Sequence, residues 1–177
     1  KDKDLIDEKK LSFAWIVDFP LFSYNKESQR FDPEHHMFTM PQQSSLKYLE
    51  EETFAPEKII ADCYDLVLNG VELASGSMRI TDPDLQRKVM ETISYSQEEI
   101  KEKFGFLLDA YEYGAPPHGG FAIGYDRLIA LLLDQEDIRE VIAFPKTKSA
   151  ESLLDGCPSL VKQKQLKELK LKSLVLQ

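Results

Sequence analysis

The sequence has few of the features that mark a membrane, secreted or nucleic-acid-binding chain. Its 177 residues contain no apolar run long enough to cross a bilayer, and we expect neither a transmembrane helix nor a signal peptide. The two cysteines, Cys63 and Cys157, lie far apart and match no zinc or disulfide spacing, so we expect reduced thiols in a cytoplasm. The net charge of −9 argues against a broad basic surface for nucleic acid.

Several common catalytic signatures are also missing. There is no Gly-x-x-x-x-Gly-Lys phosphate loop and no Ser or Cys nucleophile motif, and the glycines of residues 114–124 do not fit the dinucleotide-binding fingerprint. The three histidines have no zinc-binding spacing. The composition, with 42% hydrophobic and 30% charged residues, is that of an ordinary globular domain. Its acidic excess suits a metal ion or a cationic group of a substrate.

The strand signals favour an antiparallel arrangement. Residues 12–18 predict a buried strand, and residues 61–80 predict two strands around Asn69-Gly70, the dipeptide typical of a type I′ hairpin. A glycine-rich strand is expected over 119–124, and a short one around "VIAFP". Strands of this kind flanked by helices predict an α+β fold with a mainly antiparallel sheet.

The helix signals are strongest in the middle of the chain. Ser96 and Glu99 form a capping box, which predicts a helix that ends near Tyr111. Three further helices are predicted, over 45–52, within "DPDLQRKVMETI" and over about 126–134. The start, "KDKDLIDEKK", has the composition of a solvated linker.

The hairpin places two carboxylates on one face. With Asn69-Gly70 as a two-residue turn, Asp65 lies on the face of Glu72, at about 5–8 Å between Cβ atoms. The predicted cross-strand pairs are Leu68 with Val71, Val67 with Glu72, and Leu66 with Leu73. Two carboxylates at this distance repel unless a cation lies between them, and oxygen ligands beside a phosphate suit magnesium. The alternative is that both face solvent on an ordinary sheet.

Arg79 follows in the same strand. Strict alternation from Glu72 places Met78, rather than Arg79, on the carboxylate face. Arg79 therefore either points elsewhere or is re-aimed by a β-bulge, which we expect around Gly76-Ser77 because the residues there are small. An ordinary surface arginine is the alternative.

The remaining polar candidates are histidines and glycines. His35 and His36 are adjacent, so on a strand at most one faces a given pocket, where hydrogen bonding to a substrate is expected rather than metal binding. Gly120 and Gly124 lie on one face of a strand and leave a flat floor for a purine ring. A structural role for the histidines and tight strand–helix packing at the glycines are the alternatives.

Arg127 lies at the front of a predicted helix, in "GYDRLIALLL". A helix N-terminus already carries roughly half a positive charge, so a cation there is unfavourable unless an anion binds to both.

These motifs together resemble a known family. The segment "GAPPHGGFAIGYDRLIALL" resembles motif three of the class II aminoacyl-tRNA synthetases. The segments "FAWIVDFPLF", "HHMFT", "YDLVLNGVELASGSMRI", "FGFLLDAYEYGAPPHGG" and "IREVIAFPKTKSAESLLDGCPS" resemble the bacterial-type aspartyl-tRNA synthetases, and the resemblance extends from about residue 11 to 171. It implies a partial class II catalytic domain, in which aspartate reacts with ATP to give aspartyl-adenylate and is then transferred to tRNA.

The resemblance also implies a role for each candidate, all of them positioning the substrates. Arg127 is implied to bind the ATP γ-phosphate, and Asp65 and Glu72 to hold magnesium on ATP. Arg79 is implied to bind the aspartate side chain, and His35 and His36 to line the amino-acid pocket. Gly120 and Gly124 are implied to form the floor under the adenosine. Glu72 counts as an ATP-binding residue as well. ATP is the implied substrate, Mg²⁺ the implied cofactor, and aspartate and tRNA the implied partners of a homodimeric enzyme without membrane contact.

The sequence departs from the family in two ways. Ala74-Ser75-Gly76-Ser77 replaces the usual glycine run, so Ser75 narrows the pocket or makes a new contact. Motif one, motif two and the anticodon-binding domain are missing, so we expect a C-terminal piece that is inactive alone: a linker end over 1–10, the catalytic part over 11–159 and a tail over 160–177. The alternatives are a paralogue that binds an adenylate or a regulatory partner, and an aspartate-to-asparagine ligase.

Overall fold

The computed structural model describes residues 10–172. The chain divides into two compact units, and the boundary in the sequence lies between Gly124 and Tyr125. The first unit contains the β-strands and most of the helices, and the second contains three helical segments. Within residues 10–172, no helix combines the length and the apolar character that a membrane crossing requires.

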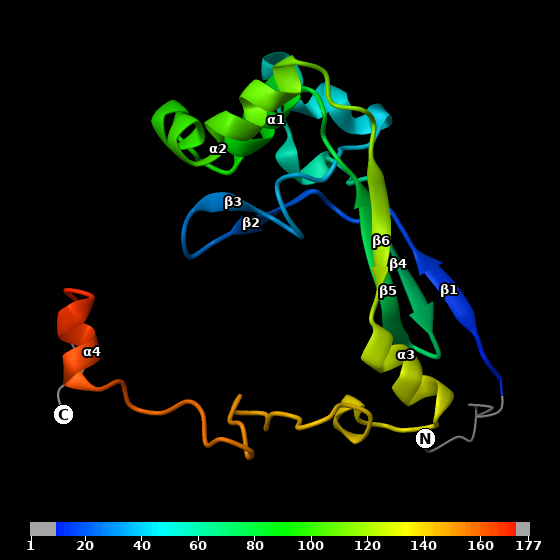
Figure 1. The fold of residues 1–177 in the computed structure, drawn as a ribbon. Coiled ribbons are helices and arrows are strands. Elements are labelled where there is room, and N and C mark those ends of the chain that lie inside the picture. The colour runs from blue at the N-terminus through cyan, green and yellow to red at the C-terminus, as the bar shows by residue number, and fades with distance from the viewer. Residues whose placement is uncertain (1–9, 173–177) are drawn as a thin grey trace. The chain divides into compact units, whose positions relative to one another are not determined.

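A four-stranded antiparallel sheet forms the long part of the first unit (Figure 1). Its strands lie in the order β1-β4-β5-β6, and all neighbouring pairs are antiparallel. Their bounds are Phe13–Ile16 for β1, Cys63–Leu68 for β4, Val71–Met78 for β5 and Gly119–Ile123 for β6. The predicted α+β class is confirmed.

The turn between β4 and β5 has the geometry that its sequence predicts. Asn69 and Gly70 have φ values of 49° and 82°, and two consecutive positive φ values define a type I′ turn. Asn69 is also fixed from outside the turn, because its Oδ1 accepts a hydrogen bond of 2.8 Å from the Ser12 N–H. The predicted hairpin is confirmed.

The register of this hairpin contains a bulge that the sequence did not locate. Leu66 pairs with Ala74, and Val67 pairs with Glu72, so Leu73 is an extra residue in β5. The predicted pairing of Leu66 with Leu73 is therefore wrong, and the bulge lies at Leu73 rather than around Gly76-Ser77. Leu73 and Ala74 are both buried. In a regular strand of a sheet with one buried face, successive side chains alternate between the buried and the exposed face, so two buried neighbours agree with a bulge.

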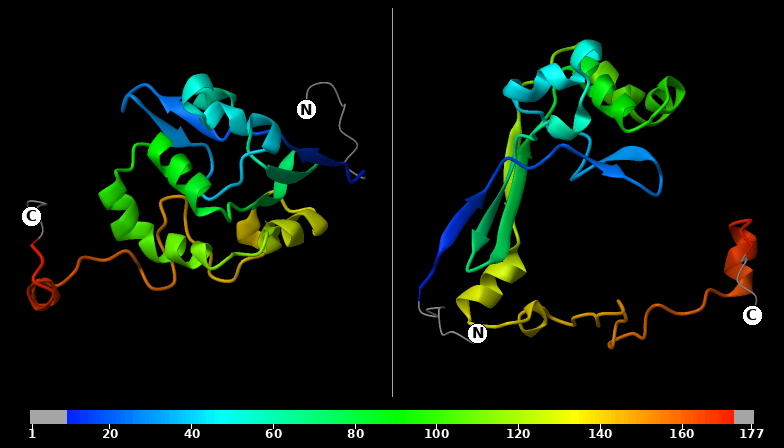
Figure 2. Two further views of the ribbon diagram at one scale, coloured as in Figure 1. Left: turned by 90° about the horizontal axis from the view of Figure 1, so that it is seen from above. Right: turned by 180° about the vertical axis from the view of Figure 1, so that it is seen from behind.

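Helices and a small hairpin gather at one end of the sheet (Figures 1 and 2). The helices are η1 (Gln43–Leu49), η2 (Glu51–Thr53), η3 (Pro56–Lys58), α1 (Pro83–Thr92) and α2 (Gln97–Glu112), and the hairpin pairs β2 (Phe22–Asn25) with β3 (Arg30–Pro33). The predicted helix over 45–52 is therefore replaced by 3₁₀ turns. The capping box is confirmed, because Ser96 Oγ accepts from the Glu99 N–H and Glu99 Oε2 accepts from the Ser96 N–H.

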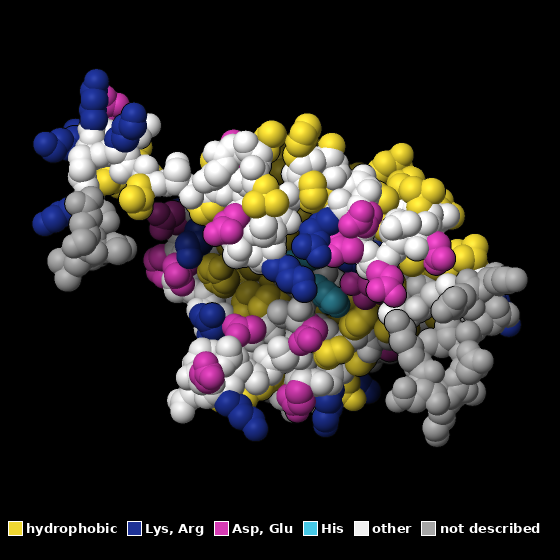
Figure 3. Space-filling view, turned by 90° about the horizontal axis from the view of Figure 1, so that it is seen from below, with side chains coloured by type: hydrophobic (Ala, Val, Ile, Leu, Met, Phe, Trp, Pro, Cys, Tyr) yellow, Lys and Arg dark blue, Asp and Glu magenta, His cyan; other side chains and the backbone are white. Residues whose placement is uncertain are grey.

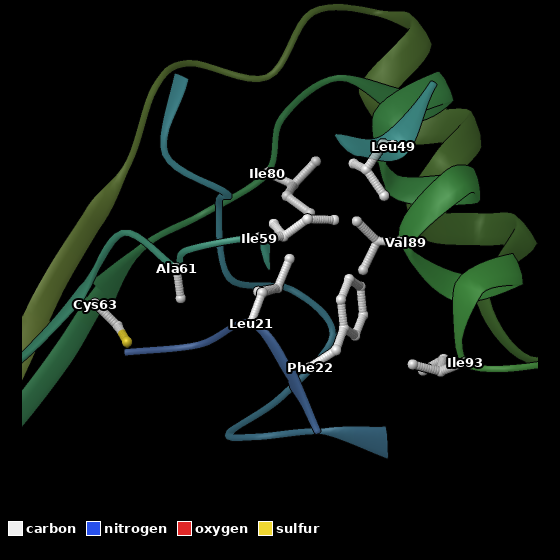
Figure 4. Close-up of a cluster of buried hydrophobic side chains, with 9 residues drawn as sticks. All are labelled: Leu21, Phe22, Leu49, Ile59, Ala61, Cys63, Ile80, Val89 and Ile93. Atoms are coloured by element: carbon white, nitrogen blue, oxygen red, sulfur yellow. The ribbon is translucent and has the colours of Figure 1, made fainter. Parts of the chain in front are cut away.

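The main core lies where α1 packs against the end of the sheet and the loops beside it. Ile59, Ile80 and Val89 are fully buried there. Figure 4 shows the cluster, made of Leu21, Phe22, Leu49, Ile59, Ala61, Cys63, Ile80, Val89 and Ile93. Ile80 follows β5, so this core anchors the end of the strand that carries the candidate site.

The other end of the sheet is less covered. Phe13 and Trp15 of β1 are more than half exposed, so the prediction of a buried strand over 12–18 is wrong in its burial. The reason is the tertiary structure: among the described elements, β1 contacts mainly β4 at the edge of the sheet, so little packs over its side chains. Trp15 instead makes edge-to-face contacts with Tyr64 and Phe121 on the same face of the sheet.

The second unit contains α3 (Tyr125–Leu132), η4 (Ile138–Glu140) and α4 (Gln163–Glu168). The strand predicted around "VIAFP" is wrong, since residues 141–144 form turns and bends. Phe144 has a φ of 54°, which no β-strand accommodates, and Pro145 follows it. The pairing nearby is a single bridge between Lys146 and Ser152.

Candidate functional site

A cavity of about 170 Å³ lies within the first unit, at the end of β5 next to the core. Three segments line it: the loop after β3, the first residue of β4, and the stretch from the second half of β5 to the residue after it. The lining residues are His35, His36, Thr39, Cys63, Ser75, Gly76, Ser77 and Arg79. The cavity is smaller than the roughly 300–1,000 Å³ of sites for drug-sized ligands, and it suits a group the size of an amino-acid side chain.

The sheet register places the two predicted carboxylates on one face. Glu72 lies directly opposite Val67, and Asp65, two residues before Val67, lies opposite Ser75. Because residues opposite each other share a face, Asp65, Glu72 and Ser75 project to the same side of the sheet. The bulge at Leu73 is what moves Ser75 to the side of Glu72, against strict alternation.

The same bulge also decides the direction of Arg79. Counting by twos from Ser75 leads through Ser77 to Arg79, whereas counting from Glu72 without the bulge leads to Met78. Arg79 lines the cavity together with Ser75 and Ser77. Of the two alternatives for Arg79, the structure therefore has the one in which a bulge brings the arginine to the carboxylate side. The bulge lies six residues before Arg79 in the chain.

Arg79 is held by the backbone and by a histidine. Its N–H donates to the His118 carbonyl at 3.0 Å, and it forms a β-bridge with Thr39. Its Nη1 donates to the imidazole of His36, where it contacts Nε2 and lies 3.0 Å from Nδ1. Since a guanidinium only donates, His36 serves as an acceptor in this contact.

His36 is kept neutral by its surroundings. Burial lowers its pKa below the usual 6.5, with the electrostatic influence of the neighbouring Arg79 and His35 as lesser causes. Both histidines line the cavity, so the prediction that at most one faces a given pocket is wrong. The reason is that they lie in a bend after β3 rather than in a strand, which removes the alternation on which the prediction depended.

Asp65 and Glu72 are the carboxylates that a magnesium ion on this face of the sheet would contact. Between residues 10 and 172, no cluster of three or more His, Cys, Asp or Glu side chains can hold a metal ion. Asp65 and Glu72 therefore offer two carboxylates and no protein cage. Magnesium commonly binds in this way, through one or two carboxylates with substrate phosphates and waters completing its shell. The pair fits a nucleotide-bound ion, and its role stays a prediction.

Gly120 of β6 and Gly124, the residue after the strand, differ in what surrounds them. Gly120 pairs with Ser77, so it lies on the carboxylate face, and a Cβ added there meets no described atom within 4 Å. Among the described residues, no close neighbour therefore requires a glycine at position 120. Gly124 follows the strand, and its N–H donates to the Leu73 carbonyl at 2.9 Å. Whether the two form a floor for adenosine stays a prediction.

Arg127 belongs to the second unit. It is the third residue of α3 and is half-buried, in the first turn of the helix where the sequence places it. Asp126 precedes it in the same turn and complements the positive end of the helix dipole. The contact of Arg127 with a phosphate stays a prediction.

Sequence reasoning missed three residues that line the cavity, which are Thr39, Cys63 and Ser77. It also missed Gln86 of α1, whose Nε2 donates to the carbonyl of Met37, the residue after His36, at 2.7 Å. Burial raises the pKa of Cys63 to about 11, with the negative charges of Asp65 and Asp62 as lesser causes, so its thiol is neutral. Ser77 was detectable by counting back two residues from Arg79, but only once the bulge was known.

Charged side chains of both signs lie on the face of the protein drawn in Figure 3. In the first unit, a second cavity of about 410 Å³ shares His35 and His36 with the smaller one. Its charged side chains are already paired: Arg30 with Asp32, and Lys103 with Glu99.

Residues 3–148 match the family described as tRNA synthetases class II (D, K and N). An aspartate–tRNA(Asp/Asn) ligase of Treponema denticola is 50% identical over 171 residues, covering 97% of this chain and 28% of the relative. One from Bacillus thuringiensis is 51% identical over 172 residues, covering 97% of this chain and 29% of the relative. The chain thus spans less than a third of the length of these curated relatives.

Solved structures share the fold. A putative aspartyl-tRNA synthetase from Leishmania major matches with a TM-score of 0.54 and 26% identity, over 79% of this chain and 22% of that one. An asparaginyl-tRNA synthetase from Entamoeba histolytica, solved with asparaginyl-adenylate, matches with a TM-score of 0.56 and 20% identity, over 79% of this chain and 26% of that one. The family match covers most of the chain and agrees with the antiparallel sheet, so this chain belongs to the class II tRNA synthetases of the D, K and N group.

Proposed function

We propose that this chain is the C-terminal part of the catalytic domain of an aspartate–tRNA ligase and supplies the aspartate pocket and part of the ATP site. The observation that carries the proposal is the cavity of about 170 Å³ with the Arg79 guanidinium in its wall, on the sheet face that also carries Asp65 and Glu72. The curated relatives, about half identical over nearly the whole chain, support the same assignment.

The pocket suits aspartate better than a neutral amino acid. A guanidinium presents a planar fork of donors that matches a carboxylate in two parallel hydrogen bonds. An asparagine side chain offers one acceptor oxygen and an NH₂ group that a guanidinium repels. His36, neutral and accepting from Arg79, orients the guanidinium without neutralising its charge. Arg79 is therefore the residue that selects the acid over the amide.

The proposed reaction has two steps. In the first, an α-carboxylate oxygen of aspartate attacks the α-phosphate of ATP, the bond to the β-phosphate breaks, and pyrophosphate leaves. In the second, a terminal ribose hydroxyl of tRNA attacks the aspartyl carbonyl, and AMP leaves. The chain's own residues bind and orient the reactants: Arg79 holds the aspartate side chain, and Arg127 binds the γ-phosphate.

Two further groups belong to the proposal. Asp65 and Glu72 would hold magnesium on the ATP phosphates, and that ion would supply neutralisation of phosphate charge. Gly120 and Gly124 would leave room under the adenine ring. The complete enzyme would use tRNA as its second substrate and act as a homodimer. The domain limits of 11–159 for the catalytic part and 160–177 for the tail remain part of this proposal.

Aspartate-dependent exchange of pyrophosphate into ATP tests the assignment. The complete polypeptide containing this chain should catalyse it with aspartate and not with asparagine. Arg79→Ala should abolish the exchange while binding of ATP, measured by calorimetry, persists. A wild-type protein without aspartate-dependent exchange, or an Arg79→Ala variant that retains it, would contradict the proposal. Lys101→Ala, at an exposed position of α2, is the matched control and should keep wild-type exchange.

A further inference from the structure

Ser77 is an unusual residue in the wall of the cavity. It lies in β5, opposite Cys63 on one side and Gly120 on the other, on the face that carries Asp65. Its exposed fraction is 5%, and its hydroxyl oxygen is buried without a hydrogen-bond partner among the described residues. Burying a hydroxyl without a partner is unfavourable, so natural proteins seldom retain one unless a ligand or a water supplies the missing bond.

The other polar groups of the cavity already have partners or face solvent. The Thr39 hydroxyl lies 3.2 Å from His36 Nδ1, and Arg79 donates to the same imidazole. Ser75 is exposed, so water is available to it. Cys63, opposite Ser77, carries a neutral thiol, which is a weak donor and acceptor.

The position of Ser77 gives it a specific ligand chemistry. Arg79 lies two residues further along, on the same side of the chain, and both residues line the cavity. A carboxylate accepts several hydrogen bonds and donates none. A hydroxyl donor next to a guanidinium therefore complements a carboxylate, whereas an ammonium or guanidinium ligand is repelled by Arg79. Rotation of the serine between its staggered rotamers changes the direction of the hydroxyl without movement of the backbone.

We propose that the Ser77 hydroxyl donates a hydrogen bond to the side-chain carboxylate of bound aspartate, next to Arg79, and so is a further substrate-binding residue. This inference rests on the proposed function and assigns a second donor to the same carboxylate. The hydroxyl that is unpartnered in the free protein gains its partner when the substrate binds. Part of the selectivity for aspartate then resides in β5 itself.

Ser77→Ala tests this directly in the complete polypeptide. The variant deletes one oxygen and fills no space, so steric effects are small. We expect the KM for aspartate in pyrophosphate exchange to rise about tenfold or more, since the lost bond is to a charged group, while the KM for ATP changes less than twofold. The melting temperature should not fall, because the deleted hydroxyl has no partner in the free protein. Ser77→Thr, which keeps a hydroxyl, should restore the KM for aspartate.

The controls separate the possible failures. Ser23→Ala, at an exposed position of β2, should leave both KM values unchanged. An active wild type with an unchanged KM for aspartate in Ser77→Ala overturns the Ser77 assignment and leaves the proposed function standing. A lowered melting temperature with both KM values raised assigns Ser77 a structural role and also overturns it. A wild type without aspartate-dependent exchange overturns the proposed function itself, and the Ser77 assignment with it.

Discussion

Gly76 lies where β6 leaves no room for a side chain on β5, and replacing it with alanine should disrupt the sheet. An added Cβ would lie 2.0 Å from the Gly120 carbonyl oxygen and 2.4 Å from the Phe121 Cβ. Both neighbours are fixed by the β5–β6 ladder, so neither yields as the end of a flexible side chain would. Ordinary contact begins at 3.4 Å, so the strands would have to separate by more than one ångström. We expect a loss of about 3 kcal/mol or more in the free energy of unfolding.

Two matched variants isolate this steric effect from the general effect of Gly→Ala. At Gly120, an added Cβ meets nothing within 4 Å, so Gly120→Ala should change stability by less than about 0.5 kcal/mol. Within α2, the nearest atom to an added Cβ at Gly105 is Lys101 Cγ at 3.8 Å. Gly105→Ala should therefore stabilise the protein by up to about 1 kcal/mol through helix propensity.

Urea unfolding of the 177-residue chain measures all three variants. Trp15 is the one tryptophan of the sequence, and its contacts with Tyr64 and Phe121 span β1, β4 and β6, so its fluorescence reports on the sheet. Linear extrapolation gives the free energy of unfolding in water. If Gly76→Ala lay within about 1 kcal/mol of wild type, the close approach of β6 to β5 would not exist as described, and the reasoning would be refuted.

Three further predictions concern the charged and ionisable groups. In the complete polypeptide, Asp65→Asn and Glu72→Gln should each raise the magnesium concentration needed for half-maximal exchange about tenfold, and unchanged titrations would rule out the carboxylate site. At pH 8, iodoacetamide should modify the exposed Cys157 at least tenfold faster than the buried Cys63, whose pKa is about 11, as peptide mass analysis over time would show. The pKa of His36 is lowered in the folded state, so its contribution to stability is present above pH 6.5 and is lost as the pH falls through the folded pKa. In His36→Gln, the free energy of unfolding should therefore fall less steeply below pH 6.5 than in the wild type, as urea unfolding at a series of pH values would show.

The sequence by itself determined the local elements of this protein. The Asn69-Gly70 turn and the Ser96 capping box form as predicted, because each depends on interactions within a few residues. The long motifs were also enough to indicate the family. Prediction failed at residues 141–145, where an apolar run typical of a strand contains a residue with positive φ.

Only the tertiary structure decided which side chains meet. The extra residue at Leu73 reverses the direction of every later side chain in β5, and no local pattern marks its position, because a bulge is stabilised by pairing and packing across strands. The bend after β3 likewise brings both histidines to one cavity, where alternation would have separated them. The burial of β1 was mispredicted for the same kind of reason: an apolar sequence predicts a surface that can be buried, and the position of the strand in the sheet decides whether it is.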